Sequence, residues 1–183
     1  ETKVTNKEED LRTADRIILP GVGAFEDAIA KLRATGLVEA ILEETEKGKP
    51  LLGICLGMQL LFETSYEYGE HKGLGLIPGE IASIEADLPA RPSGEKLKVP
   101  HIGWNSLHLK NEDPLFKYIK EGDYVYFVHS FYGKDCDESL LATSEYGIPV
   151  TASAANENVM GCQFHPEKSG EVGLRILKAF SEI

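Results

Sequence analysis

The segment Leu51–Glu63 (LLGICLGMQLLFE) is the part of this chain that most clearly indicates its fold. Its first part, Leu51–Ile54, has the composition of a buried strand, and the helical pattern of Leu56–Glu63 follows at once. The pentapeptide Gly53-Ile54-Cys55-Leu56-Gly57 at the junction has the form of a nucleophile elbow, with cysteine in place of serine. Glycines are needed on both sides because the chain turns sharply and leaves no room for side chains. The stretch therefore predicts a strand–turn–helix unit that carries Cys55 at the turn.

Cys55 is the candidate nucleophile of this unit. A thiol at a helix N-terminus is favoured as the thiolate, because the helix dipole stabilises negative charge there. The backbone N–H group of Leu56 would point toward an oxyanion that forms on a substrate. The alternative is a buried structural cysteine with glycines beside it by chance, since cysteine is often buried.

A cysteine nucleophile needs a base, and His165-Pro166-Glu167 is the candidate. It follows the predicted strand Val159–Phe164, whose end would face the same sheet edge as Cys55. His165 would take and return the thiol proton, and Glu167 would orient the imidazole and stabilise its charged form. The alternative is a capped turn before the last helix. Because each motif completes the other, a Cys-His-Glu triad is the favoured interpretation.

A glycine-rich turn, Pro20-Gly21-Val22-Gly23, follows the short apolar run Arg16–Pro20. Backbone N–H groups of Val22 and Gly23 would supply the second oxyanion donor. A phosphate loop is the alternative, but the turn lacks the Lys-Ser/Thr of a P-loop and the spacing of a dinucleotide fingerprint.

The rest of the chain alternates strand-like and helix-like segments, which favours a single α/β domain over residues 1–183. We expect a mostly parallel sheet flanked by helices, with a small additional antiparallel sheet in the middle of the chain, Leu74–Leu109. The helical pattern Phe25–Lys47 is divided at Gly36. Further strands are predicted at Tyr124–Val128, Ser139–Ser144 and Pro149–Ala155, and an exposed loop at Leu88–Gly94.

An amphipathic helix, Ser169–Phe180, closes the predicted fold. We expect Ser169 at its N-cap and Glu171 in its first turn. The side chains expected to face the core are Val172, Leu174, Ile176, Leu177 and Phe180.

Composition and charge exclude several classes of function. Lys and Arg number 19 and Asp and Glu 30, giving a formal net charge of −11 over 183 residues, whereas duplex nucleic acid and anionic membranes reward clustered positive charge. The longest apolar stretch, Leu51–Phe62, is too short to span a bilayer. The three cysteines are an odd and sparse set, which argues against a disulfide framework. We therefore expect a reducing, cytoplasmic location. No histidine pair has metal-ligand spacing, and we expect no metal and no cofactor.

Six motifs together resemble the class I glutamine amidotransferases, and the resemblance covers essentially the whole chain. They are PGVGAF (20–25), GICLGMQLLFE (53–63), GLGLIPG (73–79), PHIGWN (100–105), YFVHSFY (126–132) and GCQFHPEKSG (161–170). PHIGWN and HPEKSG resemble, within that class, the glutaminase subunits of imidazole glycerol phosphate synthases. Such subunits open with a strand and helix that have no counterpart here, so we expect that the opening strand is missing from this chain.

The resemblance implies L-glutamine as substrate and a set of residues that contact it. Gln59 matches a substrate-contacting position, and Ser130 and Phe131 match backbone contacts to the amino-acid end. Glu67 is implied to bind the substrate ammonium. The alternatives are that Gln59 caps or snorkels and that Glu67 is a solvated loop charge.

The resemblance also implies a partner, a (β/α)8-barrel cyclase subunit that forms a heterodimer with the glutaminase and receives its ammonia. Trp104 and Lys168 match the interface residues. From the residues alone, a core role for Trp104 and a solvated role for Lys168 stay open. Two competing functions remain: a partner-independent γ-glutamyl cysteine hydrolase of the same fold, and a non-catalytic scaffold subunit. An intact Cys55, His165 and Glu167 favour the amidotransferase, which would act in histidine biosynthesis.

Overall fold

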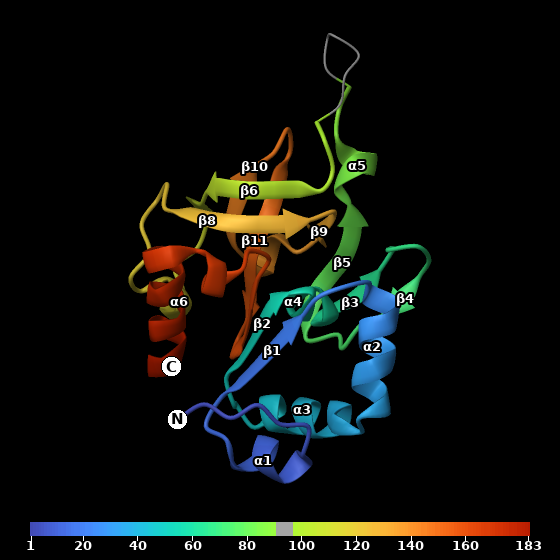
Figure 1. Cartoon of the computed structure of the whole chain (residues 1–183), viewed down its shortest axis with the longest axis vertical. Coiled ribbons are helices and arrows are strands. Elements are labelled where there is room, and N and C mark those ends of the chain that lie inside the picture. The colour runs from blue at the N-terminus through green and yellow to red at the C-terminus, as the bar shows by residue number, and fades with distance from the viewer. Residues whose placement is uncertain (91–96) are drawn as a thin grey trace.

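A six-stranded sheet in the order β1–β2–β12–β11–β10–β7 runs through the molecule, shown in the computed structural model of Figure 1. The structure describes residues 1–90 and 97–183, so part of the predicted loop Leu88–Gly94 lies outside the described residues. The strands of this sheet are β1 (Ile17–Gly21), β2 (Leu51–Cys55), β7 (His108–Leu109), β10 (Leu140–Glu145), β11 (Pro149–Asn156) and β12 (Val159–Cys162).

The parallel part of the sheet brings three chain segments to one edge. β1 and β12 both pair in parallel with β2, with Gly21 opposite Cys55 and Cys162 opposite Ile54. The carboxyl ends of the three strands therefore point the same way, and the residues that follow β1 and β12 lie near Cys55. β11, β10 and β7 continue the sheet in antiparallel pairs, so the sheet is mixed.

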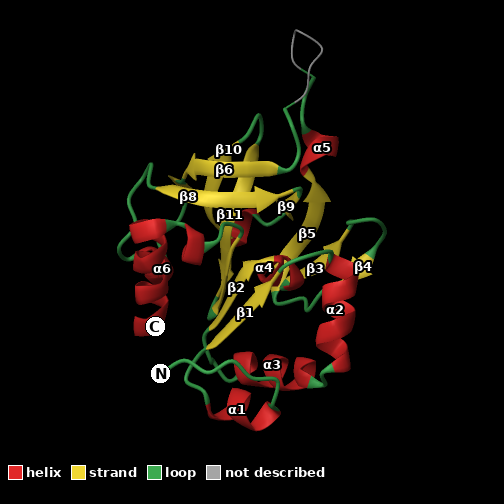
Figure 2. Ribbon diagram, viewed as in Figure 1, coloured by secondary structure: helices red, strands yellow, loops and turns green. Residues whose placement is uncertain are grey.

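Helices cover both faces of the sheet, as Figure 2 shows. Leu51 and Leu52 are both fully buried, but successive side chains of a strand point to opposite faces. Leu51 packs in a cluster with Ile41, whereas Leu52 packs in a cluster with Ile176. The helices are α1 (Glu8–Thr13), α2 (Phe25–Ala34), α3 (Leu37–Glu46), α4 (Leu56–Leu60), α5 (Ile84–Asp87) and α6 (Gly170–Glu182).

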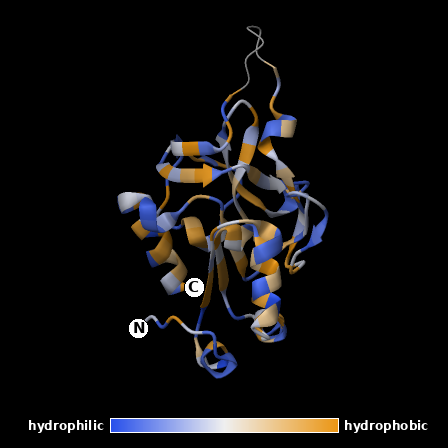
Figure 3. Cartoon of the chain, turned by 45° about the vertical axis from the view of Figure 1, so that its right-hand side comes forward, coloured by the Kyte–Doolittle hydropathy of each residue, from blue (hydrophilic) through white to orange (hydrophobic). Residues whose placement is uncertain are grey.

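The predicted division of Phe25–Lys47 at Gly36 is confirmed. Gly36 has φ +74° and stands between α2 and α3, a left-handed conformation that glycine adopts without steric cost. Apolar and polar residues alternate along α2 in Figure 3, in keeping with one buried and one exposed face.

The helix predicted over Leu56–Glu63 is shorter than expected. It ends at Leu60, and the chain continues as β3 (Phe62–Ser65). Phe62 is fully buried and pairs in parallel with Ile77, while the N–H groups of Leu74 and Leu76 bond to the carbonyls of Leu60 and Leu61. These long-range backbone bonds outweigh the local helical pattern.

Two further expectations about helices need correction. Leu174, expected inside, is 58% exposed, whereas Ile176 and Phe180 are buried as predicted. Ser169 does stand at the N-cap position of α6, but its hydroxyl donates to the carbonyl of His165 and accepts from the N–H of Tyr126. The serine therefore ties Tyr126 to the segment before α6, and does not cap the helix.

Two smaller sheets complete the fold. One is mixed, in the order β4–β3–β5–β9, and the other is an antiparallel ribbon, β6–β8. Their remaining strands are β4 (His71–Lys72), β5 (Ile77–Ser83), β6 (His101–Ser106), β8 (Tyr124–His129) and β9 (Phe131–Lys134), and short 3-10 helices lie at η1 (Pro114–Phe116), η2 (Asp137–Ser139) and η3 (Pro166–Lys168). In the described part of the chain, no helix is long and apolar enough to cross a membrane.

Candidate active site

The turn at Cys55 has the backbone geometry of a nucleophile elbow. Cys55 has φ +53° and ψ −113°, a conformation that costs a non-glycine residue free energy and that clusters at functional sites. A Cβ atom on Gly53 would lie 2.7 Å from the backbone of Met58, and one on Gly57 would overlap the carbonyl oxygen of Leu19. Both glycines are therefore required by close backbone contacts, as the motif predicted.

Burial and hydrogen bonding act in opposite directions on the Cys55 thiol, whose residue is 9% exposed. Burial is the dominant effect and raises the pKa of Cys55 to about 11. The Leu56 N–H group, the positive charge of Lys168 and a hydrogen bond from Gln163 lower the pKa, while the negative charge of Glu167 raises it. Formation of the thiolate thus depends on hydrogen-bond donors and a positive charge that other segments of the chain place near Cys55.

His165 and Glu167 form the pair that the sequence predicted. Nδ1 of His165 lies 2.7 Å from Oε1 of Glu167. The imidazole is 5% exposed and the carboxylate 51% exposed, so the pair reaches from the interior to the surface. Since Nδ1 faces a carboxylate, it carries the hydrogen, and Nε2 is left as the nitrogen that exchanges a proton.

A pocket of about 360 Å³ joins Cys55 and His165. Among the described residues, no hydrogen bond connects the two side chains, a common state of catalytic pairs that tighten only around substrate. The pocket wall contains nearly every residue predicted for the site. Its lining residues are Val22, Gly23, Cys55, Leu56, Gln59, Glu67, Pro100, Val128, His129, Ser130, Phe131, His165 and Lys168.

The predicted oxyanion donors lie on two sides of this pocket. Leu56 is the first residue of α4, and Val22 and Gly23 follow β1. Gly23 has φ +99°, and no atom lies near the position of a Cβ atom there, so the loop is constrained by backbone conformation and not by packing.

Gln59 and Glu67 reach the pocket from different elements. Gln59 is buried, and its Nε2 donates to the carbonyl of Phe131 at 3.1 Å and to Oε1 of Gln163 at 3.0 Å. Glu67 accepts the N–H of Phe25 at 2.7 Å, which ties the loop after β3 to the first turn of α2. Neither side chain is merely solvated, and their predicted contacts with glutamine stay predictions.

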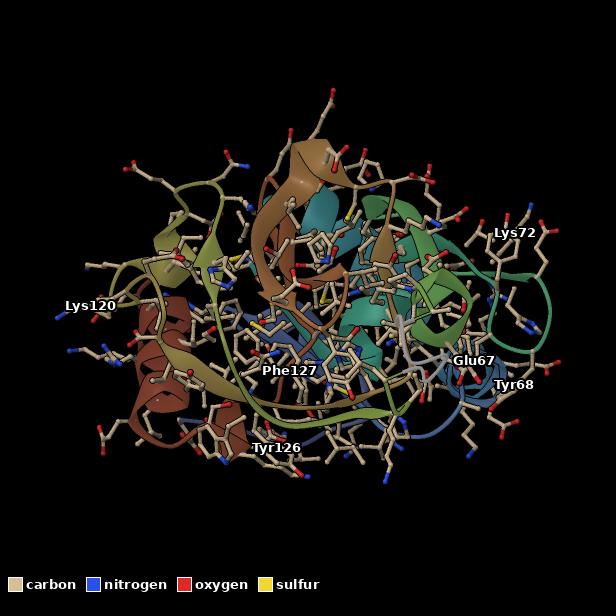
Figure 4. The ribbon with its side chains drawn as sticks, turned by 90° about the horizontal axis from the view of Figure 1, so that it is seen from above. Glu67, Tyr68, Lys72, Lys120, Tyr126 and Phe127 are labelled. Atoms are coloured by element: carbon tan, nitrogen blue, oxygen red, sulfur yellow. The ribbon has the colours of Figure 1, made fainter. Side chains whose placement is uncertain are left out.

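The two predicted interface residues lie on an exposed face beside the pocket. Trp104 on β6 is 55% exposed and packs edge-on against Tyr126 of β8, so the alternative core role is wrong. Figure 4 shows Tyr126 at the outer margin of the molecule and Phe127 farther inside, as expected for neighbours on a strand. Lys168 is exposed at the end of η3 and lines the pocket.

Sequence reasoning missed two buried polar groups near the site. Gln163 is fully buried, and its Nε2 donates to Sγ of Cys55 over 3.8 Å. His101 and His129 are hydrogen-bonded to each other at 3.0 Å, and neither was predicted to take part in the site. No local pattern indicates this contact, because only the antiparallel pairing of β6 and β8 brings the two residues together.

No cluster of metal-ligating side chains occurs within residues 1–90 and 97–183. The pocket brings together a buried thiol, an imidazole–carboxylate pair and backbone N–H groups. This combination is suited to nucleophilic attack on an acyl carbon.

Comparison with known proteins agrees with the fold and the motifs. Residues 1–182 match the family described as glutamine amidotransferase class-I. A crystal structure of a glutamine amidotransferase has a TM-score of 0.72 at 19% identity, covering 99% of this chain and 87% of that one. The structure of PurLQS from Thermotoga maritima has a TM-score of 0.65 at 22% identity, covering 92% and 79%. The chain therefore belongs to the class I glutamine amidotransferases, as its motifs predicted.

Curated relatives define the branch of this family. The imidazole glycerol phosphate synthase subunit HisH of Caldanaerobacter subterraneus is 50% identical over 100% of this chain and 86% of its own. That of Wolinella succinogenes is 54% identical over 92% and 81%. The chain groups with these HisH subunits, and its predicted role as a glutamine-hydrolysing enzyme subunit of histidine biosynthesis is confirmed.

Proposed function

We propose that Cys55, His165 and Glu167 are the catalytic residues with which this amidotransferase hydrolyses L-glutamine. The observation that carries the proposal is the strained elbow of Cys55 in the same pocket as a carboxylate-paired imidazole. His165 takes the thiol proton of Cys55, the thiolate attacks the side-chain amide carbon, and the negative charge moves to the amide oxygen. Backbone N–H groups of Leu56 and of the Val22–Gly23 turn hold that oxyanion.

Proton transfer through His165 completes the reaction. The protonated imidazole gives its proton to the leaving nitrogen, and the C–N bond breaks. Ammonia departs, and a γ-glutamyl thioester remains on Cys55. A water molecule then attacks the thioester while His165 takes its proton, and glutamate and the free thiol result. Glu167 orients the imidazole and stabilises its positive form.

The substrate groups away from the reacting carbon meet Gln59, Glu67, Ser130 and Phe131. Both N–H bonds of the Gln59 amide are used within the protein, so its Oε1 is the atom with which it receives a substrate N–H group. The Glu67 carboxylate binds the α-ammonium group, and the backbone at Ser130 and Phe131 binds the amino-acid end. The pocket volume of about 360 Å³ is in the range of small-molecule sites.

We propose further that a (β/α)8-barrel cyclase binds the exposed face around Trp104 and Lys168 and receives the ammonia directly. Ile102 and Tyr124 on the same ribbon are 57% exposed, so the face offers large apolar groups beside a pocket that holds the nucleophile. Aromatic residues of this kind are enriched at the centres of protein interfaces. Delivery across this face keeps ammonia from being protonated in water.

The test is glutamate release from glutamine, with and without the cyclase and its nucleotide ligand. We expect release to occur mainly in the complex and to vanish in Cys55→Ala. Equal release without a partner would instead support the lone γ-glutamyl hydrolase. Activity retained in Cys55→Ala would contradict the assignment of the nucleophile.

A further inference from the structure

Gln163 is a fully buried polar side chain that is hydrogen-bonded to the thiol of Cys55. It follows β12 directly and precedes the Phe164-His165 pair, and its exposed fraction is zero. Its backbone N–H donates to the carbonyl of Ala152 at 2.9 Å, which continues the pairing with β11 and fixes the residue under the elbow. A buried amide is costly unless its polar atoms are hydrogen-bonded, so the partners of its side chain indicate what it does.

Both ends of the Gln163 carboxamide have protein partners. Nε2 donates to Sγ of Cys55 over 3.8 Å, and Oε1 accepts from Nε2 of Gln59 at 3.0 Å. The orientation of the amide is settled by this second contact, because a carbonyl oxygen only accepts and an amide nitrogen only donates. Gln163 therefore presents N–H, and not oxygen, to the sulfur.

The orientation of Gln59 is settled by a backbone group. Its Nε2 also donates to the carbonyl of Phe131 at 3.1 Å. The same carbonyl lies 2.8 Å from Nδ1 of His129, so it accepts from two side chains and has a defined position. A chain of hydrogen bonds thus links the Phe131 carbonyl, Gln59, Gln163 and Cys55. Reversing either amide would place two acceptors or two donors face to face.

We propose that Gln163 is a positioning residue of the glutaminase: held by Gln59, which is itself bonded to the Phe131 carbonyl, it donates a hydrogen bond that stabilises and aims the Cys55 thiolate. The inference rests on the proposed role of Cys55 as nucleophile. A neutral donor suits this place because the charged groups at the pocket already oppose one another. The positive charge of Lys168 favours the thiolate and the negative charge of Glu167 opposes it, and the titratable side chains of His165 and Glu67 line the same pocket. Gln163 adds stabilisation without changing that balance of charge.

The experiment measures alkylation of Cys55 by iodoacetamide as a function of pH, on the full chain and without glutamine. Gln163→Met keeps the length of the side chain and removes the donor, and Gln163→Glu places a carboxylate against the sulfur. We expect the midpoint of the alkylation profile to rise by about one pH unit in Gln163→Met, which lowers the rate about tenfold below the midpoint. The rise is larger in Gln163→Glu, because like charges oppose ionisation.

Two further variants separate positioning from packing. Gln59→Met removes the group that orients Gln163, and a smaller rise of the midpoint is expected. Thr151→Val removes a buried hydroxyl that donates to the carbonyl of Gly133 and is hydrogen-bonded to Sγ of Cys136, and is expected to lower the melting temperature while leaving the midpoint of Cys55 unchanged. Alkylation of the buried Cys162 is followed by peptide mass spectrometry and reports any unfolding.

An unchanged midpoint in both Gln163 variants would overturn the proposal, and so would an equal rise in Thr151→Val. Glutamate release by the same variants is measured separately, in the complex with the cyclase. Loss of release in Cys55→Ala with no alkylation shift in Gln163→Met would leave the nucleophile assigned and remove the role of Gln163. Release retained in Cys55→Ala would remove the proposed function itself.

Discussion

Gly57, in the first turn of α4, lies so close to the carbonyl of Leu19 in β1 that a Cβ atom on residue 57 would overlap that oxygen. The contact joins the helix that begins at the nucleophile to the strand that leads into the Val22–Gly23 turn. The position of Cys55 relative to the predicted oxyanion donors therefore depends on the absence of one side chain.

Gly57→Ala is expected to displace the elbow from β1 and to abolish glutamate release. Gly36→Ala is the matched control, since its Cβ atom would meet no other atom and the cost is that of a left-handed backbone, about 1 kcal/mol. The measurements are glutamate release and the free energy of unfolding in urea. Gly57→Ala with wild-type activity would show that the close contact is not needed to shape the site.

Glu167→Gln is expected to lower kcat for glutamine by about 10- to 100-fold. The carboxylate that accepts from His165 Nδ1 would become an amide, which stabilises the charged imidazole less well. The carboxylate is half exposed, and water in part replaces it, so the loss is smaller than for a fully buried partner. Glu171→Gln, an exposed carboxylate in the first turn of α6, is the control and should retain full activity. A similar loss in both variants would point to net charge as the cause.

Stability is expected to fall as the pH drops from about 6.5 toward 4. Burial lowers the pKa of His101 to about 4 and that of His129 to about 3, from an ordinary value of 6.5. Between the folded and the unfolded pKa values, the unfolded chain binds protons that the folded chain does not. The contribution of the two neutral histidines to the free energy of unfolding is therefore complete above the unfolded pKa and is lost as the pH falls. At one pKa unit per 1.36 kcal/mol, the loss is on the order of a few kcal/mol.

Urea unfolding at pH 7, 5.5 and 4.5 measures this fall, and His101→Phe identifies its source. The phenyl ring can keep the stacking of His101 on Phe127 and Tyr146 but has no proton to bind. The variant should therefore be less stable at pH 7 and lose less on acidification. A slope equal to that of the wild type would mean that other groups cause the acid sensitivity.

Trp104→Ala is expected to weaken binding of the proposed cyclase partner by about 25-fold, the effect of losing about 2 kcal/mol at an aromatic anchor. Because the indole is exposed, the stability of the free chain should change by only about 0.5 kcal/mol. Leu174→Ala removes an exposed apolar side chain on α6 and is the control, with unchanged affinity expected. Calorimetric titration measures both, and equal affinities for wild type and Trp104→Ala would place the interface elsewhere.

Local pattern was sufficient for the elements that carry the chemistry. The Gly-x-Cys-x-Gly turn, the division of α2 from α3 at Gly36 and the strand before His165 were all predicted, because each depends on near neighbours in the chain. The local pattern was wrong at Leu61–Phe62, where the apolar residues predict that the helix continues although α4 ends at Leu60. There the pairing of Phe62 with Ile77 competes with the helix, and that pairing is invisible to a local reading.

The order of residues was enough to predict the kind of chemistry: a cysteine at a strand–helix turn, a histidine two residues before a glutamate, and motifs that assign the family. The polar groups that support that cysteine were found only in the folded chain. Gln163 reaches the cysteine because β12 lies beside β2, and Gln59, itself bonded to the Phe131 carbonyl, orients Gln163 by donating to its oxygen. The reason is physical: the identity of a reactive group is a property of one residue, whereas its protonation and aim depend on burial and donors supplied by distant segments.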